Sequence, residues 1–143
     1  MARPRVAAGV LFFDGEDRVL LVRPSYKSGW DIPGGHVEPD ESPEETMRRE
    51  VHEETGVRIA PGRLVGVYSD PARQVIAYAD GRRVQSVNLC FEARPLGADE
   101  PTTPEETLAT GYFAPDALPE PFVPIHAIRI RDALDGDRAA RIR

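Results

Sequence analysis

The sequence has one cysteine and no long apolar run, and both shortages exclude whole classes of protein. Cys90 is the single cysteine among 143 residues, so an intramolecular disulfide is excluded. It lies in an apolar, strand-like stretch, where we expect a small buried side chain. The apolar run 6–13 is broken by Asp14 and Gly15, far short of the ~20 residues that span a membrane. We therefore expect no signal peptide, no membrane span and a cytoplasmic location.

Positive charge is also scarce. The chain carries 18 lysines and arginines against 24 aspartates and glutamates, which gives a net charge of −6 and a pI near 5.1. Stable binding to nucleic acid is not expected, because it needs a basic surface. An acidic protein that handles a polyanion needs a counterion at its site, so we expect a metal ion. The length suits one domain, residues 1–143, with its own hydrophobic core.

Strand-like segments and turn signals alternate over most of the chain. The segments 14–17 and 80–81 have the composition of hairpin turns, in which Gly15 is free to adopt a positive φ. The expected strands are 6–13, 18–22, 64–68, 74–78, 84–93 and a short one at 112–113, with loops at 24–41 and 95–104 and a terminal helix at 125–134.

A second helix, over residues 43–55, has clear start and stop signals. Ser42 is suited to the N-cap, Pro43 to the first helical position, and Glu45 completes a capping box. Gly56 follows the last turn, where a left-handed residue ends many helices. The sequence therefore predicts both ends of this helix from local chemistry.

Three carboxylates share one face of this helix. At 100° per residue, Glu50, Glu53 and Glu54 lie together and border the stripe that we expect to be buried. That stripe consists of Met47, Val51 and Thr55. Carboxylates three and four positions apart repel each other. Either the face is simply solvated, or it holds a hard cation such as Mg²⁺, which prefers oxygen ligands.

The helix and the loop before it resemble a known family signature. Residues 35–57 read Gly35-x5-Glu41-x7-Arg49-Glu50-Val51-x-Glu53-Glu54-x-Gly56-Val57. This spacing resembles the signature of the Nudix hydrolases at every defining position. The resemblance implies an α/β/α sandwich with a mixed β-sheet, in which the signature forms a loop–helix–loop. It also implies Mg²⁺-dependent hydrolysis of a diphosphate linkage in a nucleotide derivative, with Mn²⁺ as a substitute.

The resemblance also implies roles for single residues. The implied metal ligands are Gly34, through its carbonyl, and Glu50, Glu53 and Glu54. Arg49 would orient Glu53 through a charge-assisted hydrogen bond, and Glu41 would tether the loop to the helix. Arg23 and Gly35 are the implied contacts to the substrate, since an arginine fork suits phosphate oxygens.

The general base is left open by a departure from the family pattern. Many relatives carry a glutamate about three residues before the aromatic pair 112–113, where this chain has Ala109. The candidates for the base are therefore the helix glutamates Glu53 and Glu54 and the loop glutamates Glu105 and Glu106.

The remaining aromatic and histidine residues favour structural roles. Trp30 is expected to pack beneath the glycine loop, with stacking on a base as the alternative. His126 is expected to be structural, and His36 and His52 to be solvated.

The substrate is predicted only from one proline. Pro71 stands 15 positions after Gly56, which resembles the ADP-ribose pyrophosphatase subgroup. The alternative is a MutT-like pyrophosphohydrolase of oxidised nucleoside triphosphates. An RNA 5′-end pyrophosphohydrolase and a non-catalytic nucleotide sensor are more remote. The expected partner is a small nucleotide, and the sequence leaves a homodimer open.

Overall fold

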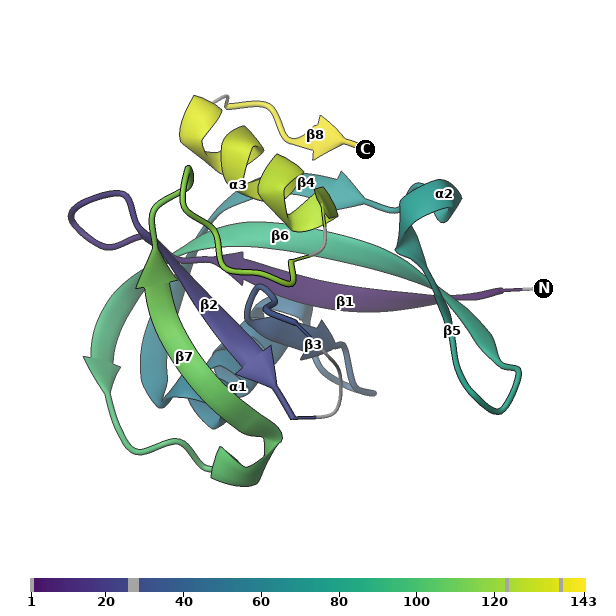
Figure 1. Ribbon diagram of the computed structural model, residues 1–143, viewed down its shortest axis with the longest axis horizontal. Coiled ribbons are helices and arrows are strands. Elements are labelled where there is room, and N and C mark those ends of the chain that lie inside the picture. Colours follow the sequence, from purple (N-terminus) through teal and green to yellow (C-terminus); the bar gives the residue numbers. More distant parts are fainter. Residues whose placement is uncertain (1, 26–28, 123, 137) are drawn as a thin grey trace.

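The computed structural model describes residues 2–25, 29–122, 124–136 and 138–143, and its centre is a mixed β-sheet (Figure 1). The sheet order is β3-β1-β6-β4-β8, and β5 also pairs with β6. The strands are β1 (Arg3–Leu11), β3 (Gly34–His36), β4 (Val57–Tyr68), β5 (Val75–Ala77), β6 (Arg83–Ala98) and β8 (Arg141–Ile142). Pairing is parallel between β1 and β6 but antiparallel between β4 and β6, so the sheet is mixed.

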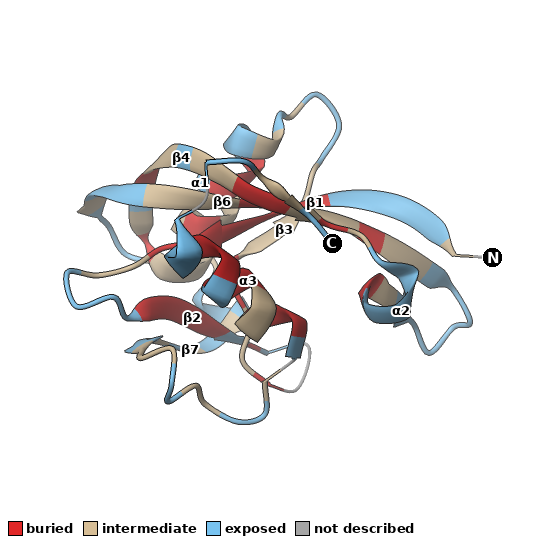
Figure 2. Ribbon diagram, turned by 90° about the horizontal axis from the view of Figure 1, so that it is seen from above, coloured by how far each residue is buried: buried red, intermediate tan, exposed pale blue. Residues whose placement is uncertain are grey.

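Two longer helices cover opposite faces of this sheet. One face carries α1 (Pro43–Thr55), whose Met47 and Val51 pack on the sheet residue Val10. The other face carries α3 (Pro124–Asp135), where Ile130 packs against Tyr68. Figure 2 shows buried segments on the sheet and on the facing side of α3. The predicted α/β/α sandwich is confirmed.

Shorter elements complete the fold. A separate two-stranded sheet pairs β2 (Val19–Pro24) with β7 (Thr107–Phe113) in antiparallel register. The helical turn α2 (Pro71–Gln74) follows β4, and the 3-10 turn η1 (Pro104–Glu106) precedes β7. The predicted terminal helix 125–134 is confirmed as α3.

The structure confirms both predicted ends of α1. The Ser42 hydroxyl accepts the N–H of Glu45 at 3.2 Å, and Gly56 has φ of 79°. The predicted buried stripe is right for two of its three residues. Thr55 is only half-buried, whereas Thr46 is fully buried. The Thr46 hydroxyl can be buried because it has two acceptor oxygens within reach, a carboxylate oxygen of Glu41 at 2.6 Å and the carbonyl of Ser42 at 3.1 Å.

The turn at 14–17 forms as predicted, but with a different residue in the left-handed region. The N–H of Asp14 donates to the carbonyl of Arg18 at 2.9 Å. Asp17 has φ of 57°, whereas Gly15 has no positive φ. Aspartate tolerates this region better than most residues do. Away from the turn the two flanking strands diverge, because β2 pairs with β7 whereas β1 pairs within the main sheet.

Several elements extend beyond their predicted bounds. The strand β6 continues to residue 98, so the predicted loop 95–104 begins too early. Pro95 is tolerated there because the register shifts beside its partner Ile59, and bulges accommodate proline. The turn α2 takes Gln74 from the predicted strand 74–78. The strands β3 and β8 were not predicted, and β3 lies inside the predicted loop 24–41, whose residues 26–28 are outside the described residues.

Cys90 is a free, fully buried cysteine, as predicted. Its burial raises the pKa of the thiol to about 11, so it is a poor nucleophile at neutral pH. Within the described residues, none of the helices is long and apolar enough to cross a membrane.

Candidate functional site

The acidic face of α1 lies against the glycines of β3. The N–H of Gly34 donates to Oε1 of Glu54 at 3.0 Å. The carboxylate of Glu50 lies so close to Gly35 that a Cβ at this position would overlap it. Glycine at position 35 therefore allows the helix carboxylate to approach the backbone directly.

Gly34 meets a second backbone constraint. Its φ is 151°, and a Cβ there would overlap the carbonyl of Ala8 and lie 2.9 Å from Cα of Gly9. Both neighbours belong to β1, to which β3 is paired in antiparallel register. The two glycines thus let one short strand fit between β1 and the acidic helix face.

Arg49 and Glu41 form the shortest ion pair of the site. Nε of Arg49 donates to Oε2 of Glu41 at 2.7 Å, and Nη2 donates to Oε1 at 3.0 Å. The Thr46 hydroxyl donates to the same carboxylate at 2.6 Å. Chiefly because of Arg49, the pKa of Glu41 falls to about 2. The loop before α1 is thereby fastened to the helix.

Arg49 also contacts the acidic face, where it lies closer to Glu50 than to Glu53, its predicted partner. Its Nη1 lies 2.9 Å from Oε1 of Glu50 and 3.5 Å from Oε2 of Glu53. The guanidinium therefore bridges three carboxylates, and the contact to Glu53 is its longest. The family resemblance had implied a pairing of Arg49 with Glu53 alone and did not include the bidentate contact to Glu41.

Two glutamates of this face lie in surroundings that disfavour their negative charge. Burial raises the pKa of Glu54 to about 8 against the opposing N–H of Gly34, and the charges of Glu50 and Asp31 raise it further. Burial likewise raises the pKa of Glu50, against the opposing charge of Arg49. A bound divalent cation would lower the pKa values of both glutamates, because it favours the ionised carboxylates.

The donor set suits a hard cation, although the ligands are not yet gathered around one point. In the part of the chain that the structure describes, no three acidic, histidine or cysteine side chains form a ready metal cluster. The reason is visible in their contacts: Glu50 and Glu53 turn toward Arg49, and Glu54 turns toward Gly34. All three offer oxygen from adjacent turns of one helix, as Mg²⁺ or Mn²⁺ requires.

The loop glutamates lie beside the same helix. Thr103, at the start of η1, donates to the carbonyl of Glu53, and the charge of Glu106 helps to raise the pKa of Glu50. Glu105 and Glu106 are both exposed. The structure thus brings η1, which carries Glu106, against the helix that bears the acidic face.

Arg23 lies near η1 at the end of β2. It is opposite Ala109 in the β2–β7 register, and its side chain is exposed. The N–H of Ser25, two residues later, donates to the carbonyl of Glu106 at 2.9 Å. Arg23 and the loop acids are therefore at the same end of the small sheet.

A buried polar cluster beside α3 was not predicted. Nε2 of His126 lies 2.9 Å from Oδ1 of Asp31, and Nδ1 lies 3.2 Å from Nη1 of Arg129. Nη2 of Arg129 donates to Oε1 of Gln74 at 3.0 Å. His126 is thus a buried linking residue, in agreement with its expected structural role. Arg129, Gln74 and Asp31 were not among the site residues predicted from the sequence.

The other aromatic and histidine predictions had mixed outcomes. Trp30 packs edge-on against Phe113, with ring centroids 4.9 Å apart, and belongs to the margin of the core. The prediction that His36 and His52 are solvated was wrong, because both are half-buried. The ring of His52 contacts the carboxylate of Asp99 at 3.1 Å.

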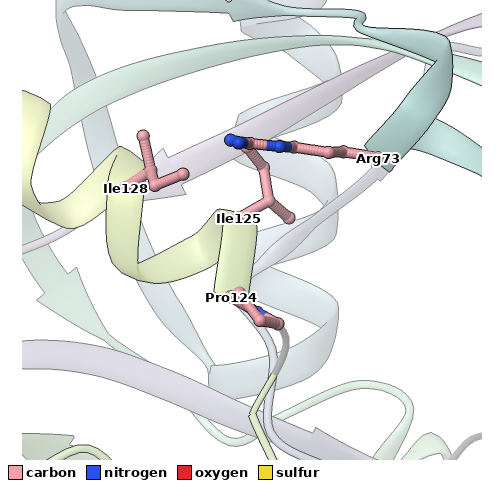
Figure 3. A pocket seen from close by; sticks show the side chains of 4 residues that line it. All are labelled: Arg73, Pro124, Ile125 and Ile128. Carbon is pink, nitrogen blue, oxygen red and sulfur yellow. The ribbon is translucent and has the colours of Figure 1, made fainter.

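A cavity of about 370 Å³ lies between α2 and α3 (Figure 3). Its lining residues are Arg73, Pro124, Ile125 and Ile128. In Figure 3 the side chain of Arg73 extends from α2 toward the two isoleucines of α3. The cavity is separate from the acidic face of α1, which lies on the opposite side of the sheet.

The chain is similar to known proteins over most of its length. The family described as NUDIX domain matches residues 3–133. A MutT-like protein from Streptomyces ambofaciens is 39% identical over 131 residues, which cover 92% of this chain and 76% of that protein. A Bacillus subtilis (strain 168) protein, named provisionally as an 8-oxo-dGTP diphosphatase, is 31% identical over 129 residues, which cover 90% and 79%.

A solved structure agrees with the observed architecture. An ADP-ribose pyrophosphatase from Streptococcus suis 89-1591 aligns with a TM-score of 0.74 at 22% identity, covering 98% of each chain. At this identity the likeness supports the fold alone, whereas the family match includes the whole of α1 and its glycine strand. The chain therefore belongs to the NUDIX family, and it is a hydrolase of pyrophosphate bonds that uses a divalent metal ion.

Proposed function

We propose that the protein hydrolyses a diphosphate linkage in a nucleoside diphosphate derivative and uses Mg²⁺ to do so. The observation that carries this proposal is the acidic face of α1 packed against Gly34 and Gly35. Three carboxylates on one side of a helix, held beside half-buried glycine backbone, form a surface that attracts metal ions and a polyphosphate.

Each residue of the signature then has a task. Glu50, Glu53 and Glu54 hold the metal ions, with the Gly34 carbonyl as a further oxygen ligand. When bound, Mg²⁺ neutralises the phosphate oxygens and acidifies the attacking water. The proposed base is Glu53, because its 3.5 Å contact with Nη1 of Arg49 is the longest that Arg49 makes with the carboxylates of Glu41, Glu50 and Glu53, so the guanidinium holds this carboxylate least.

Other residues position these carboxylates and the substrate. Glu41 holds Arg49 by its bidentate contact, and Arg49 in turn limits the torsions of Glu50 and Glu53. We assign the exposed Arg23, at the end of β2, a contact with a phosphate oxygen, because its planar guanidinium suits phosphate. Gly35 lets that phosphate approach the backbone beside Glu50.

ADP-ribose is the substrate that we favour, with AMP and a sugar phosphate as products. Pro71 occupies the first turn of α2, and Asp70 caps this turn by accepting the N–H of Ala72 at 2.9 Å. The capped turn directs Arg73 to the wall of the cavity beside α3. Because that cavity lies on the opposite side of the sheet from the acidic face, the ADP-ribose assignment rests on the position of Pro71, 15 residues after Gly56, which resembles the ADP-ribose pyrophosphatase subgroup.

The second candidate is a MutT-like nucleoside triphosphate pyrophosphohydrolase, which the names of the two sequence relatives favour. The deciding experiment compares kcat/KM for ADP-ribose, other sugar nucleotides, 8-oxo-dGTP and the common nucleoside triphosphates, with product analysis. We expect ADP-ribose or a sugar nucleotide to have the highest value. A triphosphate that is better by tenfold or more, with release of pyrophosphate, would replace the ADP-ribose assignment.

A further inference from the structure

The connection between β6 and β7 is fastened to the C-terminal end of α1. The backbone N–H and the hydroxyl of Thr103 both donate to the carbonyl of Glu53, at 3.3 and 3.2 Å. The last carbonyls of a helix have no partner within the helix, and Glu53 provides one of them. Nearby, the N–H of Asp99 donates to the carbonyl of Gly56 at 2.7 Å. Thr103 thus satisfies a carbonyl that would otherwise need water.

Thr103 also begins the turn that carries Glu106. The N–H of Glu106 donates to the carbonyl of Thr103 at 3.0 Å, which closes η1. On its other side, the carbonyl of Glu106 accepts the N–H of Ser25 at 2.9 Å. The backbone of Glu106 is therefore held at two points between α1 and the end of β2. Its carboxylate is exposed, and the turn η1 that carries it lies against α1.

We propose that Thr103 is a positioning residue that fixes η1 on α1 and so keeps the Glu106 carboxylate beside the acidic face. Glu106 then adds a fourth carboxylate to the field of the metal ions. This inference rests on the proposed function of α1 as a metal-binding helix. It assigns Thr103 no contact with the substrate, and it predicts that the effect of Thr103 on activity passes through Glu106 and not through the carbonyl of Glu53.

A double-mutant cycle tests this coupling. Thr103→Val keeps the side-chain shape but removes the hydroxyl, whereas Thr103→Ser keeps the hydroxyl. Loss of such a supporting contact lowers activity or metal affinity by about 10- to 100-fold. We expect Thr103→Val and Glu106→Gln each to lower kcat by about tenfold or more with KM nearly unchanged. In the Glu106→Gln background, Thr103→Val should have no further effect. The exposed neighbour Thr102 provides the control Thr102→Val.

The same proteins are titrated calorimetrically with Mn²⁺, which separates this inference from the proposed reaction. We expect Thr103→Val and Glu106→Gln each to weaken Mn²⁺ binding, and the double variant to bind no more weakly than Glu106→Gln. If the variants show this pattern of Mn²⁺ binding but the wild type cleaves no diphosphate substrate, the proposed reaction is wrong and the positioning role of Thr103 stands. Additive losses, wild-type behaviour of Thr103→Val, or a loss for Thr103→Ser equal to that of Thr103→Val would each overturn the inference.

Discussion

Replacing Glu41 by glutamine tests whether the loop is held on α1 by charge. The substitution keeps the shape of the side chain but removes the charge that accepts two hydrogen bonds from Arg49 and one from Thr46. Hydrogen bonds to charged groups contribute about 1.5–3 kcal/mol each. Because glutamine retains one acceptor oxygen, we expect a loss of about 1–3 kcal/mol in the free energy of unfolding at pH 7, or roughly 3–10 °C in Tm.

The pH dependence gives this prediction its sign. The pKa of Glu41 lies at about 2 in the folded protein, below its ordinary value of 4.5. A carboxyl whose pKa is lowered by folding stabilises the fold fully when the pH is above its pKa in the unfolded chain. This stabilisation is lost as the pH falls through its pKa in the folded protein. The stability difference between wild type and Glu41→Gln should therefore be constant above pH 5 and shrink between about pH 4.5 and 2.

Chemical denaturation across this pH range measures the difference. The control is Glu44→Gln, which removes one charge from an exposed glutamate in the first turn of α1. Both variants change the interaction with the helix dipole, but only Glu41→Gln breaks the contact with Arg49. Equal stability of the two variants at pH 7, or parallel curves down to pH 2, would refute the assignment of Arg49 and Glu41 as the clamp.

Three other predictions concern the acidic face directly. Glu53→Gln and Glu54→Gln should each lower kcat by about 10²–10⁴ with an unchanged circular dichroism spectrum; near-wild-type rates at saturating Mg²⁺ would contradict the site. EDTA should abolish activity, and Mg²⁺ or Mn²⁺ should restore it better than Zn²⁺, whereas full activity in metal-free buffer would exclude the mechanism. Gly35→Ala should lower activity at least tenfold, because its Cβ displaces the Glu50 carboxylate, while Gly15→Ala, which meets open space, should act like wild type in the same assay.

The helix was predictable because its signals are local. Ser42 and Gly56 mark the two ends of α1 by hydrogen bonds within one turn, so neighbouring letters suffice to place them. The strand β3 gave no such signal, because Gly34 and Gly35 have low strand propensity. It forms only because β1 offers a partner strand and leaves room for residues without side chains.

The site shows the same division. Helical spacing alone placed Glu50, Glu53 and Glu54 on one face, since the period of a helix is fixed. The contact between Asp31 and His126 was beyond such reasoning, because these residues are far apart in sequence and meet only when α3 covers the sheet. The attachment of Thr103 to Glu53 likewise depends on where a long strand ends, which composition does not specify.

The parallel pairing of β1 with β6 also determines when the site can form during synthesis. Arg3 pairs with Val84 and Leu11 with Glu92, so β1 meets its partner about 80 residues after it leaves the ribosome. Contacts this distant in sequence form slowly. A nascent chain that ends before residue 83 already contains every letter of the 35–57 signature, but the strand that supports Gly34 has only one edge paired. All residues of the signature are thus synthesised well before β6, the strand that completes the support of β1 and β3, is available.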